Sequence, residues 1–371
     1  MPATLRVPRT PLSPALRHRI SDRFRTLAAG VLAVASIAGL HAGERDGRLE
    51  IYWVDSQGGG STLLVSPGGE SVLIDTGNPG GRDSGRILKV AKEVAGLTQI
   101  DHLIITHLHS DHFGGAPEIA AAIPVRHLYD NGIPDRDPDG NADASWPLRS
   151  RAYREMTVGE RRIAKPGGRL VLRGASAPNA PLTSLVFVAA RQKLALDLPD
   201  TNTISACRDL TPRAKDTSDN ANSIVTLLQC GSFRYFNGGD LTWNVEATLV
   251  CPEPQVGSVD VYQVNHHGLD ISNHPLLLRQ LAPSIAVFNN GPRKGCMPDV
   301  VTRLRELPSL QAIYQVWRNQ VVDAANAPAP YCANDGGDGG NYLKLSVAPD
   351  GASYTVTVPS TGHQRTFLTR L

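Results

Sequence analysis

A run of ten residues, Thr106 to Gly115 with the sequence THLHSDHFGG, holds four candidate metal ligands within six positions. These ligands are His107, His109, Asp111 and His112. The apolar residues just before the run, at 101–106, predict a β-strand, so the run forms a loop at one end of that strand. Neutral imidazoles and carboxylates are the usual protein ligands of zinc and similar divalent ions. The run therefore predicts a metal site at the edge of a sheet, and a solvated polar loop without metal is the alternative.

Short strands and helices alternate along the rest of the chain. The sequence predicts strands at 49–54, 62–66, 71–74, 125–129, 185–189, 224–229, 233–236, 259–264, 285–289, 312–316, 342–347 and 353–358, and helices at 83–97, 116–122, 146–156, 275–281 and 299–307. Because the two kinds of element interleave in both halves, we predict an α/β (α+β) fold with two helix-covered sheets in one domain, residues 43–371. Polar stretches near 131–181 and 197–220 are predicted to be insertions, the first lying over one face of the domain.

The first 42 residues have the pattern of a secretory signal peptide. Six arginines precede a stretch of apolar or small residues at 27–40, and small residues around Ala42 offer a cleavage site. The stretch is shorter than the roughly 18–20 residues that a membrane-spanning helix needs. We therefore expect a secreted or periplasmic protein with no stable membrane insertion after cleavage. An uncleaved anchor and a mis-assigned start codon on a cytosolic protein are the alternatives.

Charge and cysteine content limit the partners and the compartment. Residues 43–371 hold 31 Lys and Arg against 34 Asp and Glu, so the predicted domain has no bulk electrostatic attraction for polyanions. The five cysteines lack the CxxC spacing of a zinc ribbon. In an oxidising compartment they can form up to two disulfides, and each can equally be a small buried apolar residue.

The flanking motifs carry a family resemblance. THLHSDHFGG resembles the signature of the metallo-β-lactamase superfamily, which implies a four-layer αββα sandwich with one or two metal ions at the sheet edges. Four further motifs resemble those of the hydrolase domain of the competence protein ComEC, in the same order along the chain. They are VDSQGGGS (54–61), VLIDTG (72–77), NANSIV (220–225) and VNHHG (264–268), and FRYFNGGD (233–240) matches the Gly-Asp strand end that lies between the last two.

The resemblance implies a role for each candidate ligand. His107 and His109 would hold one divalent ion, Asp111 and His112 the other, and Asp240 would bridge the two. His266, or alternatively His267, would complete a shell, and the other histidine of the pair, taken as His267, would act with Asp111 on substrate protons. The ions would be Zn²⁺ or Mn²⁺, and Asp75 would orient the site through hydrogen bonds. Asp130, Asn131, Arg293 and Lys294 are further candidates to line or charge the cleft.

Two positions depart from the family pattern. Cys296 stands where the ComEC pattern has the histidine of a Gly-His-Pro motif, so it is either a thiolate ligand or a buried or disulfide-bonded cysteine. The superfamily also has a histidine between the cluster and the bridging aspartate. Here the only histidine between positions 112 and 240 is His127, which lies close to the cluster in sequence. One metal position is therefore expected to be weak or partly filled by water.

These features predict an exported metal-dependent hydrolase that uses a metal-bound hydroxide and no organic cofactor. The resemblance implies a phosphoesterase, either a phosphodiesterase or a nuclease-like enzyme, acting on a small-molecule or nucleic-acid phosphoester. One alternative is hydrolysis of a lactone, thioester or β-lactam carbonyl. The other is a non-catalytic binding protein with a vestigial metal site. The sequence leaves the oligomeric state open.

Overall fold

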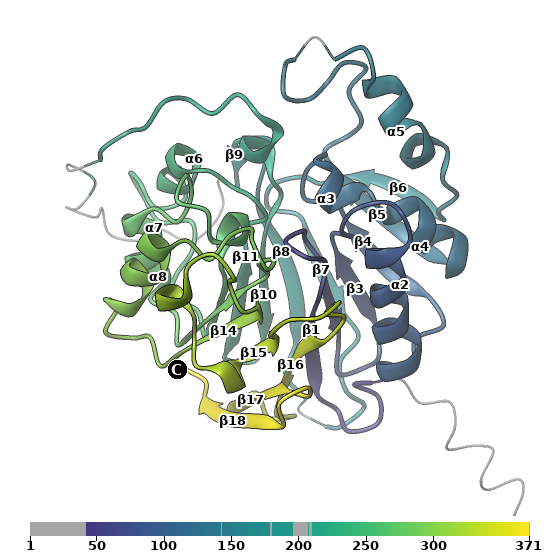
Figure 1. Ribbon diagram of the computed structural model, residues 1–371. Coiled ribbons are helices and arrows are strands. Elements are labelled where there is room, and N and C mark those ends of the chain that lie inside the picture. Colours follow the sequence, from purple (N-terminus) through teal and green to yellow (C-terminus); the bar gives the residue numbers. More distant parts are fainter. Residues whose placement is uncertain (1–41, 142, 179, 196–206, 208–209, 371) are drawn as a thin grey trace, which may run out of the picture. The chain divides into compact units, whose positions relative to one another are not determined.

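Two β-sheets form the centre of the computed structural model, which describes residues 42–141, 143–178, 180–195, 207 and 210–370 (Figure 1). The first sheet has the strand order β18 (His363–Leu368), β17 (Ser353–Val358), β16 (Tyr342–Val347), β1 (Leu49–Val54), β2 (Thr62–Val65), β3 (Ser71–Ile74), β4 (Ile100–Ile104), β5 (Val125–Asp130) and β6 (Glu160–Ile163). The second has the order β15 (Cys332–Asn334), β14 (Ala312–Trp317), β13 (Ile285–Phe288), β12 (Val261–Gln263), β11 (Phe233–Asn237), β10 (Val225–Cys230), β8 (Thr183–Ala190) and β7 (Arg169–Leu172), and β9 (Lys193–Leu194) pairs with β8.

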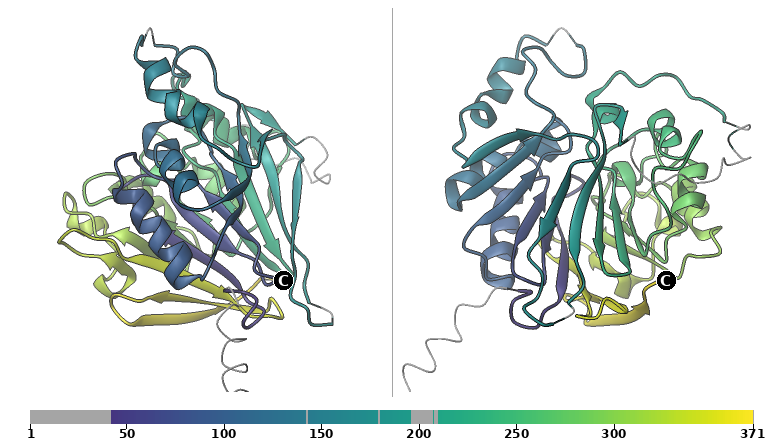
Figure 2. Two further views of the ribbon diagram at one scale, coloured as in Figure 1. Left: turned by 90° about the vertical axis from the view of Figure 1, so that its right-hand side faces the viewer. Right: turned by 180° about the vertical axis from the view of Figure 1, so that it is seen from behind.

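Helices cover the outer face of each sheet (Figure 1, Figure 2). On the first sheet these are α2 (Arg82–Lys89), which continues as the π-helix Val90–Val94, and α4 (Ala116–Ala122). On the second sheet they are α6 (Trp243–Thr248), α7 (Pro275–Leu281) and α8 (Pro298–Arg305). The helices α3 (Ser110–Phe113) and α5 (Trp146–Glu155) lie at the upper ends of the strands in Figure 1. Short 3₁₀ helices span Asp219–Asn222, Asn265–Gly268, Asp323–Ala325 and Ala329–Tyr331. None of the helices that the structure describes has the length and hydrophobicity needed to traverse a lipid bilayer.

Three separate apolar cores lie between the layers, which confirms the predicted four-layer αββα arrangement. The side chains of β1 show how the cores divide, because Ile51 and Trp53 enter the core between the sheets while Tyr52 and Val54 enter the core under the helices of the first sheet. Trp53 meets Tyr235 of the second sheet edge to face, with ring centroids 5.9 Å apart. Both faces of these strands are covered, and this explains their continuous burial.

The segment 131–181 is partly built into the sheets. Its strand β6 pairs in parallel with β5, and its strand β7 pairs antiparallel with β8, so the segment extends both sheets instead of only lying over one face. The edge strand β6 has the sequence ERRI and is largely exposed, so it carries no apolar run that could have predicted it. The strands β15 and β18 and helix α6 were also not predicted. Residues 1–41, which include nearly all of the expected signal peptide, and 196–206 lie outside the described residues.

Candidate metal centre

The candidate ligands follow the carboxyl ends of strands that run parallel within their sheets. β3, β4 and β5 are parallel in the first sheet, and β11 to β14 are parallel in the second. The loop after β4 leads through His107 and His109 into α3, which carries Asp111 and His112. Asp240 follows β11, and the His266–His267 turn follows β12. Parallel strands present their carboxyl ends at one edge, so both sheets deliver polar side chains to the same crevice.

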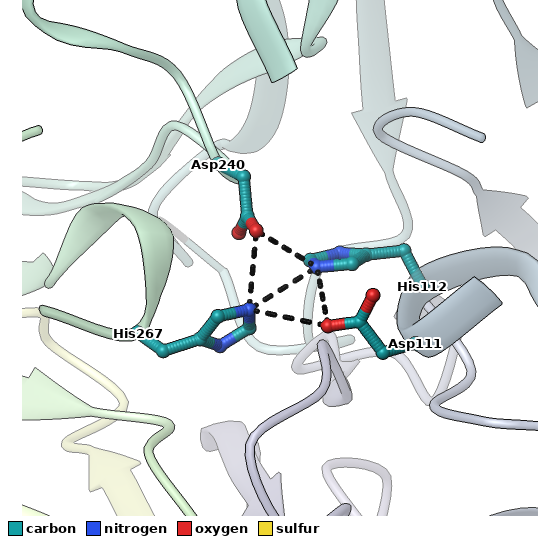
Figure 3. Close-up of side chains that lie close together, drawn as sticks. All are labelled: Asp111, His112, Asp240 and His267. Carbon is teal, nitrogen blue, oxygen red and sulfur yellow. Dashed lines mark hydrogen bonds and ion pairs between the residues drawn. The ribbon is translucent and has the colours of Figure 1, made fainter. Parts of the chain in front are cut away.

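Four of these residues form a compact group, the Asp111–His112–Asp240–His267 cluster (Figure 3). Their ligand atoms all lie within 4.8 Å of one another. Asp240 Oδ2 lies 3.2 Å from Nε2 of His112 and 3.2 Å from Nε2 of His267. Asp111 Oδ2 lies 3.6 Å from each of the same two nitrogens. Two carboxylates and two imidazoles at this spacing make a donor set that suits a divalent cation.

His107 and His109 form a pair beside this cluster. His107 Nε2 lies 3.1 Å from His109 Nδ1, and the ring of His107 is tilted by 48° against that of His112, with ring centroids 4.1 Å apart. The other ring nitrogens are held, because His107 Nδ1 faces Thr106 Oγ1 at 3.0 Å and His109 Nε2 faces Asp139 Oδ1 at 2.9 Å. The two nitrogens that face each other, His107 Nε2 and His109 Nδ1, are therefore the atoms that can ligate a second ion.

Of the two adjacent histidines, the structure brings His267 into the cluster. His266 and His267 both have positive φ, 54° and 55°, because the chain leaves β12 through a left-handed turn and not as an extended strand. His267 joins the cluster, and its Nδ1 lies 3.2 Å from the carbonyl oxygen of Asn289. His266 lies outside the cluster, although its Nε2 is 3.5 Å from the same Oδ2 atom of Asp240, and its Nδ1 lies 3.1 Å from Ser272 Oγ. The geometry favours His267 as the ligand and gives His266 a supporting position.

Asp75 orients the site as expected. Its Oδ2 lies 2.8 Å from His112 Nδ1 and accepts a hydrogen bond from Thr106 Oγ1, also at 2.8 Å. A carboxylate on the far nitrogen of a histidine leaves the near nitrogen free to bind metal. Gly60 is required for this contact, because a Cβ there would lie 2.7 Å from both Asp75 Oδ2 and His112 Nδ1.

The carboxylates of the cluster favour a positive charge at this buried position. Burial opposes protonation of His112, but the carboxylates of Asp240, Asp75 and Asp111 raise its pKa well above the usual value. Burial would likewise raise the pKa of Asp240, but His112 and His267 hold it well below its usual value. Burial is the main reason that the pKa of His266 falls to about 4, so this imidazole is neutral near pH 7. A buried centre that stabilises a cation is suited to exchange a proton for a metal ion.

The remaining candidates lie as follows. Lys294 places its ammonium 2.5 Å from Asp111 Oδ2, so the charge expected near 293–294 does reach the site. His127 stacks on His102, with ring centroids 5.5 Å apart, and contacts Glu160, so within the described part of the chain no contact joins it to the cluster. Cys296 is a buried free thiol that accepts a hydrogen bond from Gln315 Nε2, which does not support the thiolate-ligand alternative.

One residue at the site, Asp139, was not predicted from the sequence. It lies in a Pro-Asp-Gly turn with no pattern that points to a site.

The cysteines divide between one disulfide and three thiols. Cys207 and Cys251 are bonded, and Cys230, Cys296 and Cys332 are buried and free. Up to two disulfides were expected, and one is present among the described residues. Burial raises the pKa of Cys296 to about 12 and that of Cys332 to about 12, so both stay protonated at neutral pH.

Comparison with known proteins agrees with this architecture. Residues 55–166, from the first glycine-rich loop through α5 to β6, match the family model of the metallo-beta-lactamase superfamily. The chain has the metallo-beta-lactamase fold. The matched segment contains Asp75 and all four ligands of the THLHSDHFGG run, and Asp240 and His267 come from the second half of the same fold.

Individual relatives match shorter segments. A UPF0173 metal-dependent hydrolase of Cupriavidus metallidurans is 35% identical over 84 residues, which is 21% of this chain and 26% of that protein. A lactamase-like protein, nscB, of Aspergillus fumigatus is 37% identical over 79 residues, 21% of this chain and 23% of that protein. The solved structure of CmlA, a diiron β-hydroxylase from Streptomyces venezuelae, is 15% identical and covers 65% of this chain and 44% of that one, with a TM-score of 0.34. The chain spans about a quarter of the length of the curated relatives named here.

Proposed function

We propose that the protein is a metal-dependent hydrolase whose centre is the Asp111–His112–Asp240–His267 cluster. The observation that carries this proposal is the convergence of four ligand atoms within 4.8 Å at the carboxyl ends of strands from both sheets. The metallo-beta-lactamase fold and the description of the bacterial relatives as metal-dependent hydrolases support it. The same four residues would hold one ion, and His107 with His109 would contribute to a second.

A divalent ion in this position supplies a Lewis acid and an activated water. The chain's own residues set the geometry around it. Asp75 and the Asn289 carbonyl fix the orientation of the His112 and His267 rings. Asp111 is the member of the cluster with the most exposed side chain, 19% against 3% or less for the others. Asp111 is therefore the group placed to accept a proton at its other carboxylate oxygen, Oδ1, and pass it towards a leaving group.

We propose a phosphoester as the substrate, which is a small phosphodiester or a nucleic-acid strand. This proposal rests on the resemblance of five motifs to the ComEC hydrolase domain. It also rests on the two adjacent metal positions proposed above, because pairs of metal ions catalyse displacement at phosphorus in phosphatases and nucleases. A second candidate is hydrolysis of a lactone, thioester or β-lactam carbonyl. The name of the fungal relative, lactamase-like protein, favours that alternative.

We also propose that the protein is exported. The basic and apolar pattern of residues 1–42 supports this. The Cys207–Cys251 disulfide is consistent with an oxidising compartment. Mass spectrometry of the protein recovered from fractionated cells would show cleavage near Ala42 in the exported fraction. A full-length chain confined to the cytosol would contradict export.

The function is tested on purified protein stripped with a chelator and then reloaded with Zn²⁺ or Mn²⁺. Bis(p-nitrophenyl) phosphate, a lactone and nitrocefin serve as substrates. We expect metal-dependent hydrolysis of the phosphodiester, its loss in Asp240→Ala, and its retention in Asp101→Asn, a buried aspartate outside the cluster. Hydrolysis of only a carbonyl substrate would establish the second candidate. A metal-loaded protein inert to all three would overturn both and favour a binding protein with a vestigial site.

A further inference from the structure

A cavity of about 400 Å³ borders the His107–His109 side of the metal centre. Its wall includes Leu108, which stands between those two histidines, and residues 131–134 with Pro138 from the chain after β5. Its lining also includes Arg191 and two residues of the 3₁₀ helix Asp219–Asn222. A substrate group that extends past the reacting bond on this side would enter this cavity.

Arg191 occupies an unusual backbone position for an arginine. Arg191 and Gln192 form the two-residue turn between β8 and β9, in which Ala190 pairs with Lys193. Both turn residues have positive φ, 52° and 59°, a conformation for which Asn-Gly is the favoured sequence. Non-glycine residues in this region are strained, and such strain is concentrated at functional sites. The geometry of the turn therefore does not by itself explain why Arg191 and Gln192 occupy these two positions.

The surrounding residues hold Arg191 in place over the cavity. The backbone N–H of Arg191 donates to the carbonyl oxygen of Asn222 at 3.2 Å, and Gln192 Nε2 donates to Asn222 Oδ1 at 3.0 Å. The guanidinium of Arg191 lies against Gly132, where an added Cβ would be 2.9 Å from Nη2 of Arg191. The absence of a side chain at Gly132 thus leaves the space that the guanidinium uses.

The charges and hydrogen-bonding groups of the cavity suit a negatively charged ligand group. Asp219 uses both carboxylate oxygens within the fold, accepting from the Leu108 N–H at 2.7 Å and from Asn222 Nδ2 at 3.0 Å. Among the described residues, no carboxylate forms an ion pair with Arg191. Asn131 is 7% exposed, and within the described part of the chain its Oδ1 has no hydrogen-bond partner. The cavity therefore offers one cation and one buried acceptor.

The geometry points to Arg191 as a specificity determinant that binds a second, non-reacting anionic group of the substrate, a carboxylate or a phosphate. Asn131 Oδ1 accepts a hydrogen bond from an N–H or O–H group on the same part of the substrate. The guanidinium presents paired N–H donors that match either anion. This inference rests on the proposed function, because it names the class of substrate for the same metal centre.

The test uses the metal-loaded protein and two matched pairs of p-nitrophenyl substrates, one pair of phosphodiesters and one pair of carboxylic esters. The members of each pair differ only by a terminal carboxylate or phosphate. The variants are Arg191→Gln, Arg191→Lys and the control Lys193→Gln, which removes an exposed charge on β9 outside the cavity. We expect the ratio of kcat/KM for the charged over the uncharged member to fall about tenfold or more in Arg191→Gln, to fall less in Arg191→Lys, and to stay unchanged in Lys193→Gln.

Binding provides a readout that does not depend on turnover. Calorimetric titration of the metal-loaded protein with succinate, and separately with inorganic phosphate, should show about tenfold weaker binding of at least one anion in Arg191→Gln than in Lys193→Gln. The anion affected identifies the group recognised. Equal selectivity and equal anion affinity in the two variants would overturn the inference. Arg191-dependent anion binding without hydrolysis of any substrate would count against the proposed function alone.

Discussion

The Oδ2 atom of Asp75 lies 2.8 Å from Nδ1 of His112, and this contact turns the opposite ring nitrogen of His112 towards Asp240 and His267. We expect Asp75→Asn to weaken divalent-metal binding by roughly 10- to 100-fold, because an amide no longer selects the correct tautomer. Competition with a chromophoric chelator would measure the affinity. Asp101→Asn, a buried aspartate that accepts hydrogen bonds from Ser71, is the control and should leave metal affinity unchanged. Equal affinities in both variants would refute this role.

The two adjacent histidines should respond differently to removal. His267→Ala deletes a nitrogen of the cluster, so we expect metal affinity to fall by about 100-fold or more. His266→Ala removes a ring that lies outside the cluster and contacts Asp240 Oδ2 and Ser272 Oγ, and it should reduce affinity by less than about tenfold. Metal content after dialysis, with circular dichroism to check folding, measures both effects. The reverse order would identify His266 as the metal ligand.

Gly60 should be intolerant of any side chain. Its added Cβ would overlap the Asp75–His112 contact at 2.7 Å from each partner, so Gly60→Ala should weaken metal binding by about tenfold or more. Gly85→Ala is a matched control within α2, where an added Cβ meets no atom within 4 Å. That control should keep metal affinity and gain roughly 0.5–1 kcal/mol in the free energy of unfolding. Chelator competition and urea titration together test the pair.

Lys294 competes with a metal ion for the same carboxylate oxygen of Asp111. Because its ammonium lies 2.5 Å from Oδ2, we expect Lys294→Gln to tighten metal binding by roughly three- to tenfold. Arg293→Gln removes a neighbouring exposed charge and should change the affinity by less than about twofold. Weaker binding in Lys294→Gln would mean that the lysine supports the loaded site.

Glu246 should make stability depend on pH. Burial raises its pKa to about 7, although Asn265 Nδ2 and the backbone N–H groups of Asn273 and His274 donate to its carboxylate. Since the folded-state pKa lies above the unfolded value, its contribution is fully present below about pH 4.5 and is lost as the pH rises through 7. Relative to Glu246→Gln, the metal-free protein should lose about 3 kcal/mol of unfolding free energy across this range.

Urea titrations of both proteins between pH 4.5 and 8 measure this difference. The exposed Glu306→Gln is the control and should give the same pH dependence as the unchanged protein. A difference between the protein and Glu246→Gln that stays constant with pH would show that Glu246 does not titrate in this range.

Local sequence was sufficient for most elements and for the metal-binding run. Strands such as 71–74 and 285–289 are short apolar runs bounded by turns, and the helices at 83–97 and 275–281 have helical spacing of apolar residues. The run at 106–115 predicts metal binding because it holds four candidate ligands within six positions. Edge strands such as β6 were not predictable, since their charged residues face solvent and follow no apolar pattern.

The amino-acid order alone was thus enough to indicate a helix-covered two-sheet fold with divalent-metal chemistry at the end of one strand. The choice between His266 and His267, the approach of Lys294 to Asp111 and the pairing of His109 with Asp139 emerged only from the folded chain. Each of these depends on a backbone turn or on a contact between segments far apart in sequence. Sequence patterns record local preferences for structure, but ligand geometry depends on how distant strand ends meet in space.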